Sequence, residues 1–189
     1  MPAKIDPDIV RMAAETVRAE VIVPPTLKLD PALLEKIRER VPIFQGLVPD
    51  RLLRTLALAE QYPVKDGEAV FRQGDLGDSF YVVLSGEFAV ERRSNGEVVE
   101  LTRLGAGSCF GEMALVAHHT RSATLRAVGG DAVALRFYRD HVDAMPEVAS
   151  LLYRNIARIL AERLEVSSEM LADLVRQRRE PPAPCAPPS

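Results

Sequence analysis

Gly111, Glu112 and Arg121 lie close together in the chain and could jointly hold a phosphorylated sugar. A glycine at a turn lets backbone N–H groups come close to an anion. The glutamate can accept hydrogen bonds from a sugar hydroxyl, and the planar arginine side chain offers donors that suit a phosphate. Because the flanking residues are apolar and β-rich, we expect this loop to lie in a packed β scaffold.

Other groups that could do chemistry give weaker patterns. His118, His119 and His141 lack cysteine or carboxylate partners at a recognised metal spacing, so we predict an exposed histidine pair and no metal site. Cys109 lies in an apolar run and fits a small core residue better than a nucleophile. With no P-loop pattern and no Gly-x-Ser-x-Gly elbow, we predict that the protein is not an enzyme.

The composition is that of an ordinary globular protein. With 189 residues, the chain can form one domain with a substantial core and some peripheral helix. The formal charge of −3 gives no reason to expect non-specific binding to nucleic acid. We interpret the basic cluster of Arg176, Arg178 and Arg179 as a solvated helix end, offset by Asp173 and Glu180.

Cysteine use and hydropathy indicate the compartment. Cys109 and Cys185 do not form a disulfide framework, and residues 1–20 show no signal peptide. No apolar run is long enough to span a bilayer. We therefore expect a cytoplasmic protein without a membrane partner.

The uneven distribution of glycine and proline indicates where the chain divides into segments. All eleven glycines fall between Gly46 and Gly130, and five of the fourteen prolines fall in the last nine residues. We predict an N-terminal helical extension (1–29), a β domain (30–145), a long helix (146–180) and a disordered tail (181–189).

Apolar residues recur at helical spacing in both the N-terminal and the C-terminal parts of the chain. The N-terminal part predicts an amphipathic helix over 7–20, a second helix opened by Asp30 and Pro31, and a third over 49–60. From Pro146, an apolar stripe runs to Val175. A helix of this length exceeds what intrinsic propensity supports, so we expect the stripe to pack partly on the β unit and partly on a second chain.

Short strands are indicated from Tyr62 onwards. Asn95-Gly96 is a strong hairpin signal, and Gly129-Gly130 separates the last two strand candidates. The candidates are 69–71, 80–84, 88–90, 98–99, 101–104, 109–110, 122–128 and 132–137. This spacing predicts a sandwich or a jelly-roll barrel.

Several motifs in order resemble the cyclic-nucleotide-binding domain family, which includes the bacterial catabolite activator protein and protein kinase A regulatory subunits. The resemblance covers about residues 32–164. It is carried by 41–44 with Gly46-Leu47, by 70–75, by 80–86, and by Phe110-Gly111-Glu112 with Arg121-Ser122-Ala123-Thr124. It implies a mainly β fold, an eight-stranded jelly roll (a double-stranded β-helix barrel) with N-terminal helices and a long C-terminal helix.

The resemblance also implies roles in the loop. Gly111 and the short helix after it would present N–H groups, Glu112 would accept from the ribose 2′-hydroxyl, and Arg121 would pair with the cyclic phosphate. Ser122 and Ala123 would add backbone N–H donors. The full expected ligand-binding set is Gly111, Glu112, Met113, Ala114, Arg121, Ser122, Ala123, Val90 and Leu101.

Departures from the family pattern bear on ligand choice. Thr120 stands where many members have proline, and His118-His119 replaces a segment that is often glycine-rich or acidic. Ser122 follows the arginine, where some cGMP-selective members carry threonine. Serine resembles the cAMP-responsive bacterial activators, so we expect cAMP as the ligand without excluding cGMP, and no further cofactor.

Two positions on the C-terminal helix are candidates for contact with the base of the nucleotide. Ser167 and Ser168 resemble the activator's hydroxyls that meet the adenine, but counting without gaps from Pro146 puts that site one turn earlier, near Glu162 and Arg163. Two hydroxyls on a solvated helix face are an equally good interpretation.

Three functions remain open. The first is a stand-alone cyclic-nucleotide receptor that moves its C-terminal helix on binding and signals to a protein partner, with a possible homodimer through that helix. The second is a truncated transcription regulator; because the chain ends in proline soon after the long helix, we expect no DNA binding. The third is a nucleotide-independent interaction module on a degenerate fold, in which Arg121 and Glu112 are only a structural ion pair.

Overall fold

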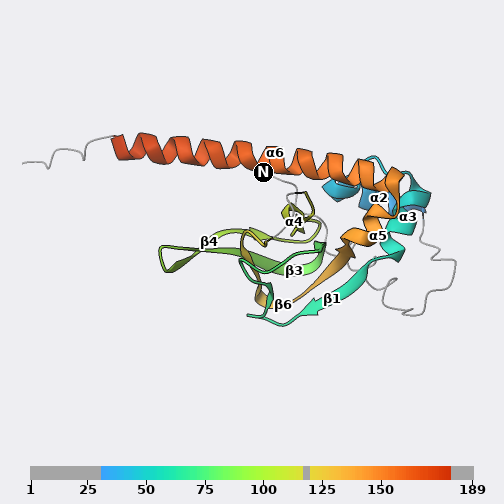
Figure 1. Ribbon diagram of the computed structural model, residues 1–189, viewed down its shortest axis with the longest axis horizontal. Coiled ribbons are helices and arrows are strands. Elements are labelled where there is room, and N and C mark those ends of the chain that lie inside the picture. The colour runs from blue at the N-terminus through green and yellow to red at the C-terminus, as the bar shows by residue number, and fades with distance from the viewer. Residues whose placement is uncertain (1–30, 117–119, 180–189) are drawn as a thin grey trace, which may run out of the picture.

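The middle of the chain folds into an antiparallel β-roll with helices before and after it (Figure 1). The computed structural model describes residues 31–116 and 120–179. One sheet has the order β1-β6-β3-β4, with β2 paired to β6 and β5 paired to β3. Its strands are β1 (Glu60–Val64), β2 (Ala69–Phe71), β3 (Ser79–Ser94), β4 (Glu97–Leu104), β5 (Cys109–Phe110) and β6 (Thr124–Tyr138).

Three strands, β3, β4 and β6, each join two of the expected ones. In β3, the register shifts on both sides of Ser85, and Gly86 has a φ of 78°. A Cβ atom at Gly86 would lie 2.6 Å from the Cβ of Ala132, so the strands approach too closely there for a larger residue. In β6, Gly129 and Gly130 bend the strand without ending it. The predicted β-roll is confirmed. In the described residues, the eight expected strands appear as the five elements β2 to β6, and β1 precedes them.

The hairpin between β3 and β4 has the turn that the sequence predicts. Asn95 and Gly96 have φ values of 51° and 88°, and a type I′ turn requires both to be positive. The hairpin pairs Ser94 with Glu97, and a bulge follows at Val90 and Glu91. This bulge changes which β4 side chains face the inside of the roll.

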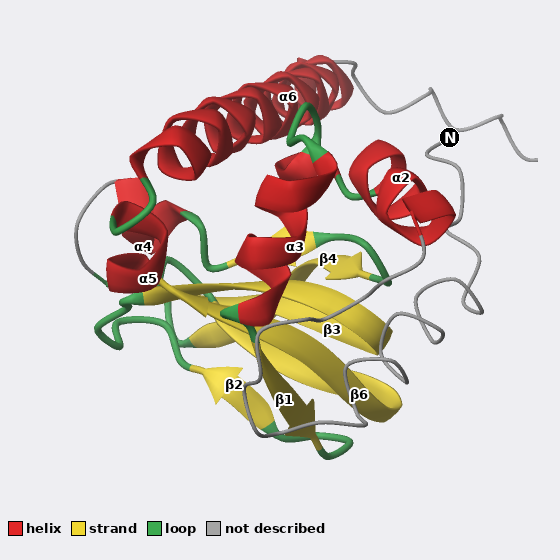
Figure 2. Ribbon diagram, turned by 90° about the vertical axis from the view of Figure 1, so that its right-hand side faces the viewer, coloured by secondary structure: helices red, strands yellow, loops and turns green. Residues whose placement is uncertain are grey.

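The helices pack on one face of the sheet, as Figure 2 shows for α2, α3 and α6. The elements are α2 (Pro31–Arg40), the 3-10 helix η1 (Pro42–Phe44), α3 (Pro49–Ala57), α4 (Met113–Val116), α5 (Arg139–Asp143) and α6 (Pro146–Arg179). Helix α3 ends before the expected residue 60, because the chain already enters β1 at Glu60. No described helix is both long and apolar enough to cross a membrane.

Alternation along the strands divides the core in two. Phe80, Val82 and Phe137 pack against the helices, whereas Tyr81 and Val83 face the inside of the roll. The inner cluster consists of Val64, Tyr81, Val83, Phe88, Phe110, Leu125, Ala127, Ala132 and Ala134. The candidate site opens from this inner side.

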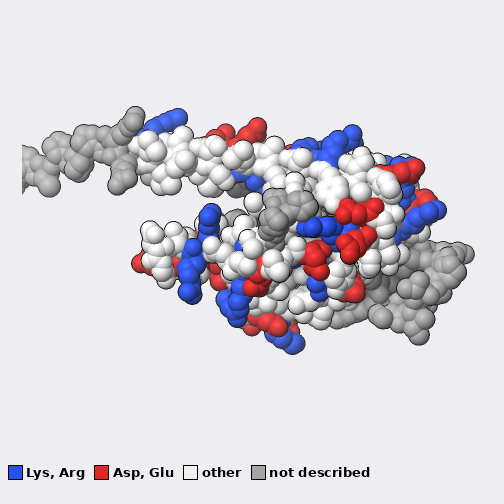
Figure 3. Space-filling view, viewed as in Figure 1, with Lys and Arg blue, Asp and Glu red and all other residues white. Residues whose placement is uncertain are grey.

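Helix α6 packs on the domain only along its first half. The buried amide of Asn155 donates to the carbonyls of Ile43 (2.9 Å) and Gln45 (2.8 Å), which ties α6 to η1. Beyond this part, Leu164 and Met170 are 68% and 63% exposed. Figure 1 shows this half of α6 extending past the sheet, on the same side as the β3–β4 hairpin. The face in Figure 3 carries charges of both signs intermixed.

Several expectations lie outside the described residues. They are the helix over 7–20, the cap at Asp30, the histidine pair His118-His119, and the tail 181–189 with Cys185.

Candidate functional site

The site is built around the loop that joins β5 to β6. Gly111, with a φ of 77°, turns the chain out of β5 and into α4. The amide of Ala114 then donates to the Gly111 carbonyl at 3.3 Å, and that of Leu115 donates to the Glu112 carbonyl at 3.0 Å. Glu112 is therefore placed at the start of α4, directly behind the glycine turn.

The turn between β2 and β3 fixes the backbone of Arg121. The Arg121 amide donates to the Asp75 carbonyl at 2.7 Å, and the Gly74 amide donates to the Arg121 carbonyl at 2.8 Å. The turn is closed by the Asp75 carboxylate, which accepts from the Arg72 amide at 2.7 Å. Both backbone groups of Arg121 are thus held by a segment more than forty residues away in sequence.

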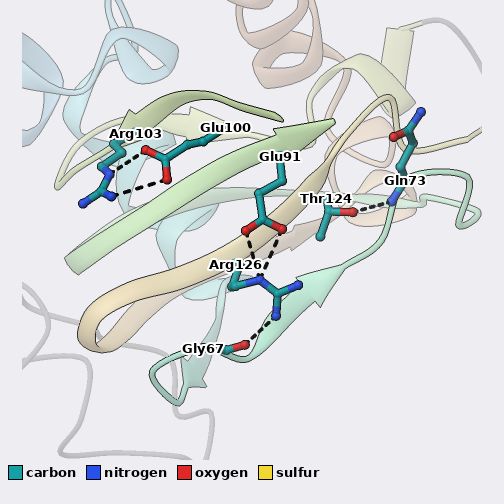
Figure 4. Close-up of polar contacts among 7 residues, drawn as sticks. All are labelled: Gly67, Gln73, Glu91, Glu100, Arg103, Thr124 and Arg126. Atoms are coloured by element: carbon teal, nitrogen blue, oxygen red, sulfur yellow. Dashed lines mark hydrogen bonds and ion pairs between the residues drawn. The ribbon is translucent and has the colours of Figure 1, made fainter. Parts of the chain in front are cut away.

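Further polar contacts brace the neighbouring strands (Figure 4). The Gln73 amide donates to the Thr124 hydroxyl at 3.0 Å, at the start of β6. On the outer surface, Arg126 pairs with Glu91 at 3.1 Å and also donates to the Gly67 carbonyl. The exposed Glu100–Arg103 pair on β4 has a closest distance of 2.7 Å. These contacts stabilise the roll, and only the first lies next to the loop.

The guanidinium of Arg121 is buried inside the roll, where the residue is 4% exposed. Its Nη1 donates to the carbonyls of Ser79 (2.8 Å) and Gly111 (2.9 Å), and its Nη2 donates to the Ser79 hydroxyl (3.2 Å). The guanidinium carbon lies 4.1 Å from the centre of the Phe71 ring. Burial lowers the pKa of Arg121 from its ordinary value. Nε is buried without a hydrogen-bond partner.

Two glycines make room for this guanidinium. A Cβ atom at Gly77 would lie 2.6 Å from Arg121 Cζ, and one at Gly111 would lie 2.7 Å from Nη1. Real Cβ atoms do not come this close, so the arginine occupies space that the missing side chains leave. Gly77 and Gly111 are therefore part of the site through their lack of a side chain.

Glu112 is equally buried, at 1% exposure. Its Oε1 accepts a hydrogen bond from Nη1 of Arg163 on α6, and Arg163 Nη2 donates to the Cys109 carbonyl at 2.7 Å. Its Oε2 has no partner. Burial raises the pKa of Glu112, and the Arg163 guanidinium opposes that shift. Burial also raises the pKa of the Cys109 thiol, to about 12.

Glu112 and Arg121 line the same pocket. The pocket has about 450 Å³ of empty space, which includes solvent at its mouth. Its lining consists of Phe71, Val90, Leu104, Phe110, Gly111, Glu112, Met113, Ala114, Arg121, Ser122, Ala123, Leu125 and Arg163. Two of these residues each have one buried polar atom without a partner: Oε2 of the acidic Glu112 and Nε of the basic Arg121. Leaving such an atom unpaired costs about 1–3 kcal/mol. Such an arrangement suits a ligand that carries both an anionic group and a hydroxyl donor.

The structure brings together every residue of the expected binding set except Leu101. Leu101 is 56% exposed and lies outside the lining. The bulge explains this, because Val90 pairs with Thr102 while Glu91 pairs with Glu100, so Leu101 is the extra residue. Leu104, opposite Phe88, takes the inner position instead.

Ser167 and Ser168 also lie outside the lining. Both are exposed, and their hydroxyls donate to the carbonyls of Arg163 and Leu164 at 2.8 Å. The α6 residue in the pocket is Arg163, close to where counting without gaps points. Ser167 follows it by one turn on the same helix face. Base contact by Ser167 and Ser168 stays a prediction.

Sequence reasoning missed two parts of the site. The first is the pairing of Arg163 with Glu112, for which the count from Pro146 was the only signal. The second is the apolar wall formed by Phe71, Phe110 and Leu125. Strand period could have found Leu125, which follows Ala123 by two residues and therefore shares its face.

Comparison with known proteins gives a consistent family. Residues 62–147 match the family model described as "Cyclic nucleotide-binding domain". The "Cyclic AMP receptor protein" of Thermus thermophilus is 36% identical over 124 residues, which cover 65% of this chain and 57% of that protein. A "CRP-like cAMP-activated global transcriptional regulator" of Mycobacterium tuberculosis is 32% identical over 149 residues, covering 75% and 63%.

Solved structures agree. The crystal structure of Thermus thermophilus catabolite activator protein matches with a TM-score of 0.64 and 34% identity, covering 71% of this chain and 63% of that one. The regulatory domain of Toxoplasma gondii protein kinase A, crystallised with cAMP, matches with a TM-score of 0.55 and 25% identity, covering 62% and 46%. This chain thus spans less than two thirds of these relatives. Residues 62–147 therefore match the cyclic nucleotide-binding domain family, and the described β-roll has the fold of these solved structures.

Proposed function

We propose that this protein is a cAMP receptor that repositions α6 on binding and thereby signals to a protein partner. One observation carries the proposal: Glu112 and Arg121 are both buried in one pocket, and each keeps a polar atom without a partner. A purely structural role for these side chains would not account for the two unpaired atoms. This is a binding function and not a catalytic one, and it agrees with the regulatory names of the relatives.

The two unpaired atoms suggest how the ligand would lie. Nε of Arg121 would donate to the cyclic phosphate, with backbone N–H groups of Ser122 and Ala123 nearby. Oε2 of Glu112 would accept from the ribose 2′-hydroxyl. The base would then extend past Val90 towards α6, where Ser167 is one turn beyond Arg163.

The choice of cAMP over cGMP rests on Ser122 and on the relatives. The Thermus and Mycobacterium proteins are named for cyclic AMP, and the Toxoplasma domain was crystallised with it. We therefore expect the pocket to prefer cAMP. In this proposal, residues 30–145 bind the nucleotide in the cytoplasm, and residues 146–180 transmit the signal.

Arg163 connects the pocket to α6. Its guanidinium holds Oε1 of the carboxylate that would receive the ribose, so a ligand at Glu112 meets a residue of the helix directly. A ligand shifts a conformational equilibrium only by its differential affinity for the two states. Contact with the Arg163–Glu112 pair would supply that difference.

Titration calorimetry tests the receptor proposal. Protein that has been unfolded, freed of nucleotide and refolded should bind cAMP more tightly than cGMP. Arg121→Lys should weaken cAMP binding by roughly tenfold to a few hundredfold, because a charge-assisted hydrogen bond contributes about 1.5–3 kcal/mol. Arg103→Gln, which alters an exposed pair on β4, is the control. Folded protein that binds neither nucleotide would overturn the proposal.

A second function is favoured by the exposed half of α6. Its large apolar side chains at Leu164, Met170, Leu171 and Leu174 are 62–68% exposed. They could bind a second copy of the chain or another helix whether or not nucleotide is present. Sedimentation with and without cAMP separates the two functions, since assembly that ignores the ligand favours an interaction module. A mobility-shift assay with promoter DNA tests the further expectation that DNA is not the partner.

A further inference from the structure

We propose that Arg136 is a positioning residue for the ligand, which acts on Arg121 through the hydroxyl of Ser79. The inference rests on the proposed function, because it assigns Arg136 a role in binding the anionic group. Arg136 does not line the pocket. It lies on β6 opposite Tyr81 of β3, which belongs to the inner cluster, so the two residues share the inner face of the sheet.

Ser79 links the two arginines. Its fully buried Oγ accepts from Arg121 Nη2 at 3.2 Å and from Arg136 Nε at 3.3 Å. With both lone pairs used, the Ser79 proton is directed at the Tyr81 hydroxyl, 3.5 Å away. The hydroxyl of one serine therefore accepts a hydrogen bond from each of the two guanidinium groups.

Ser79 also fixes the orientation of Arg121. Of the three hydrogen bonds that the Arg121 guanidinium makes, two go to Ser79, one to its carbonyl and one to its hydroxyl. Nε is the nitrogen left without a partner. If the Ser79 hydroxyl turned away, Nη2 would lose its acceptor, and only the two hydrogen bonds of Nη1 would still hold the guanidinium and its Nε in place.

Arg136 is itself firmly held. Its guanidinium carbon lies 4.3 Å from the centre of the Tyr138 ring and 5.9 Å from that of Tyr62. Its Nη2 is 3.6 Å from the Asp78 carboxylate. Aromatic and acidic neighbours thus keep Nε aimed at Ser79, and they place a second positive charge behind the arginine that would meet the phosphate.

The test compares substitutions at Arg136 and Ser79 with one on the same strand. Arg136→Gln and Ser79→Ala should each weaken cAMP binding by roughly threefold to tenfold, the range of a single modest hydrogen bond. Arg136→Lys keeps a charged donor and should restore most of the affinity. Arg126→Gln removes a positive charge from the outer side of β6 and should leave affinity within about twofold of the wild type.

A double-mutant cycle distinguishes positioning from a general structural effect. In the Arg121→Lys background, Arg136→Gln should cost less than about twofold, because the group that it positions is gone. An equal loss in both backgrounds would overturn the proposal. So would an Arg136→Gln protein with wild-type affinity.

A spectroscopic readout separates this inference from the receptor proposal. The Nε–H resonance of Arg121, identified by its absence in Arg121→Lys, should shift in Arg136→Gln and stay in place in Arg126→Gln. If the wild type binds no cyclic nucleotide, the receptor proposal fails, and the resonance still decides whether Arg136 positions Arg121. An unshifted resonance would contradict the link through Ser79.

Discussion

Arg163 of α6 and Glu112 of the β5–β6 loop form an ion pair between two partners of very different exposure. The Glu112 side chain is 2% exposed, whereas that of Arg163 is 41% exposed. The pair joins α6 to a carboxylate that is buried at the start of α4. Any movement of α6 away from the pocket must therefore leave a buried negative charge without its neighbour, which opposes that movement in the ligand-free protein.

Removing the arginine should destabilise the fold. We expect Arg163→Gln to lower the free energy of unfolding by about 1–2 kcal/mol, because the buried carboxylate loses its charged donor. The loss should stay below the roughly 3–5 kcal/mol of a fully buried pair, since Arg163 is partly solvated. Urea unfolding of the nucleotide-free protein measures it.

Arg176→Gln is the matched control on the same helix. Arg176 pairs with Asp173 at 3.7 Å, and both side chains are well exposed. This substitution should change the free energy of unfolding by less than about 0.5 kcal/mol. Equal effects of the two substitutions would show that the Arg163–Glu112 pair does not contribute to stability.

Replacing the buried acid should change the pH dependence of stability. Burial raises the pKa of Glu112 above its ordinary 4.5, so the folded state holds a proton that the unfolded state releases. The stability that this proton contributes is present below pH 4.5 and is lost as the pH rises through the raised pKa. We therefore expect the difference in unfolding free energy, wild type minus Glu112→Gln, to fall as the pH rises from 4.5. A difference that grows with pH would contradict this direction.

Local pattern was enough to predict most of the fold. Asn95-Gly96, the apolar stripe from Pro146 and the β-branched runs each act through neighbours in sequence, and the structure confirms the hairpin, the long helix and the β-roll. The merging of 80–84 with 88–90 could not be predicted in the same way. It depends on the close approach of Gly86 to Ala132, which belongs to another strand.

Residues of the loop were easier to predict than residues that meet it from elsewhere. Glu112 and Arg121 share one segment, so their spacing carries the signal. Leu101 was misplaced because a bulge depends on pairing across strands, and sequence period alone does not locate it. The roles of Gly77 and Ser79 depend on a guanidinium more than forty residues away, so only the folded structure reveals them.

Cys109 should react slowly in the folded protein. Burial raises its thiol pKa to about 12, and the residue is 3% exposed, so little reactive thiolate is available near neutral pH. In a Cys185→Ser background, we expect the reaction with a disulfide reagent at pH 8 to be at least about a hundredfold slower than in urea. Absorbance of the released thiolate follows it. Similar rates in both conditions would show that the β5 strand opens readily.

Two glycine substitutions should test the space around Arg121. Gly77→Ala would place its Cβ 2.6 Å from Arg121 Cζ, and Gly111→Ala would place its Cβ 2.7 Å from Nη1. We expect both to displace the guanidinium and to weaken cAMP binding by tenfold or more, roughly the loss of one charge-assisted contact. Calorimetry gives the affinity, and unfolding in urea gives the stability of each variant.

Gly67→Ala separates crowding from backbone strain. Gly67 has a φ of 77°, the same as Gly111, but a Cβ there would meet no atom within 4 Å. It should lower stability by about 1–2 kcal/mol and leave cAMP affinity unchanged. Gly77 does not have a positive φ, so its substitution adds crowding without that strain. If Gly77→Ala bound cAMP as well as Gly67→Ala does, the ligand would tolerate a displaced Arg121 guanidinium. The orientation of Arg121 would then not control binding.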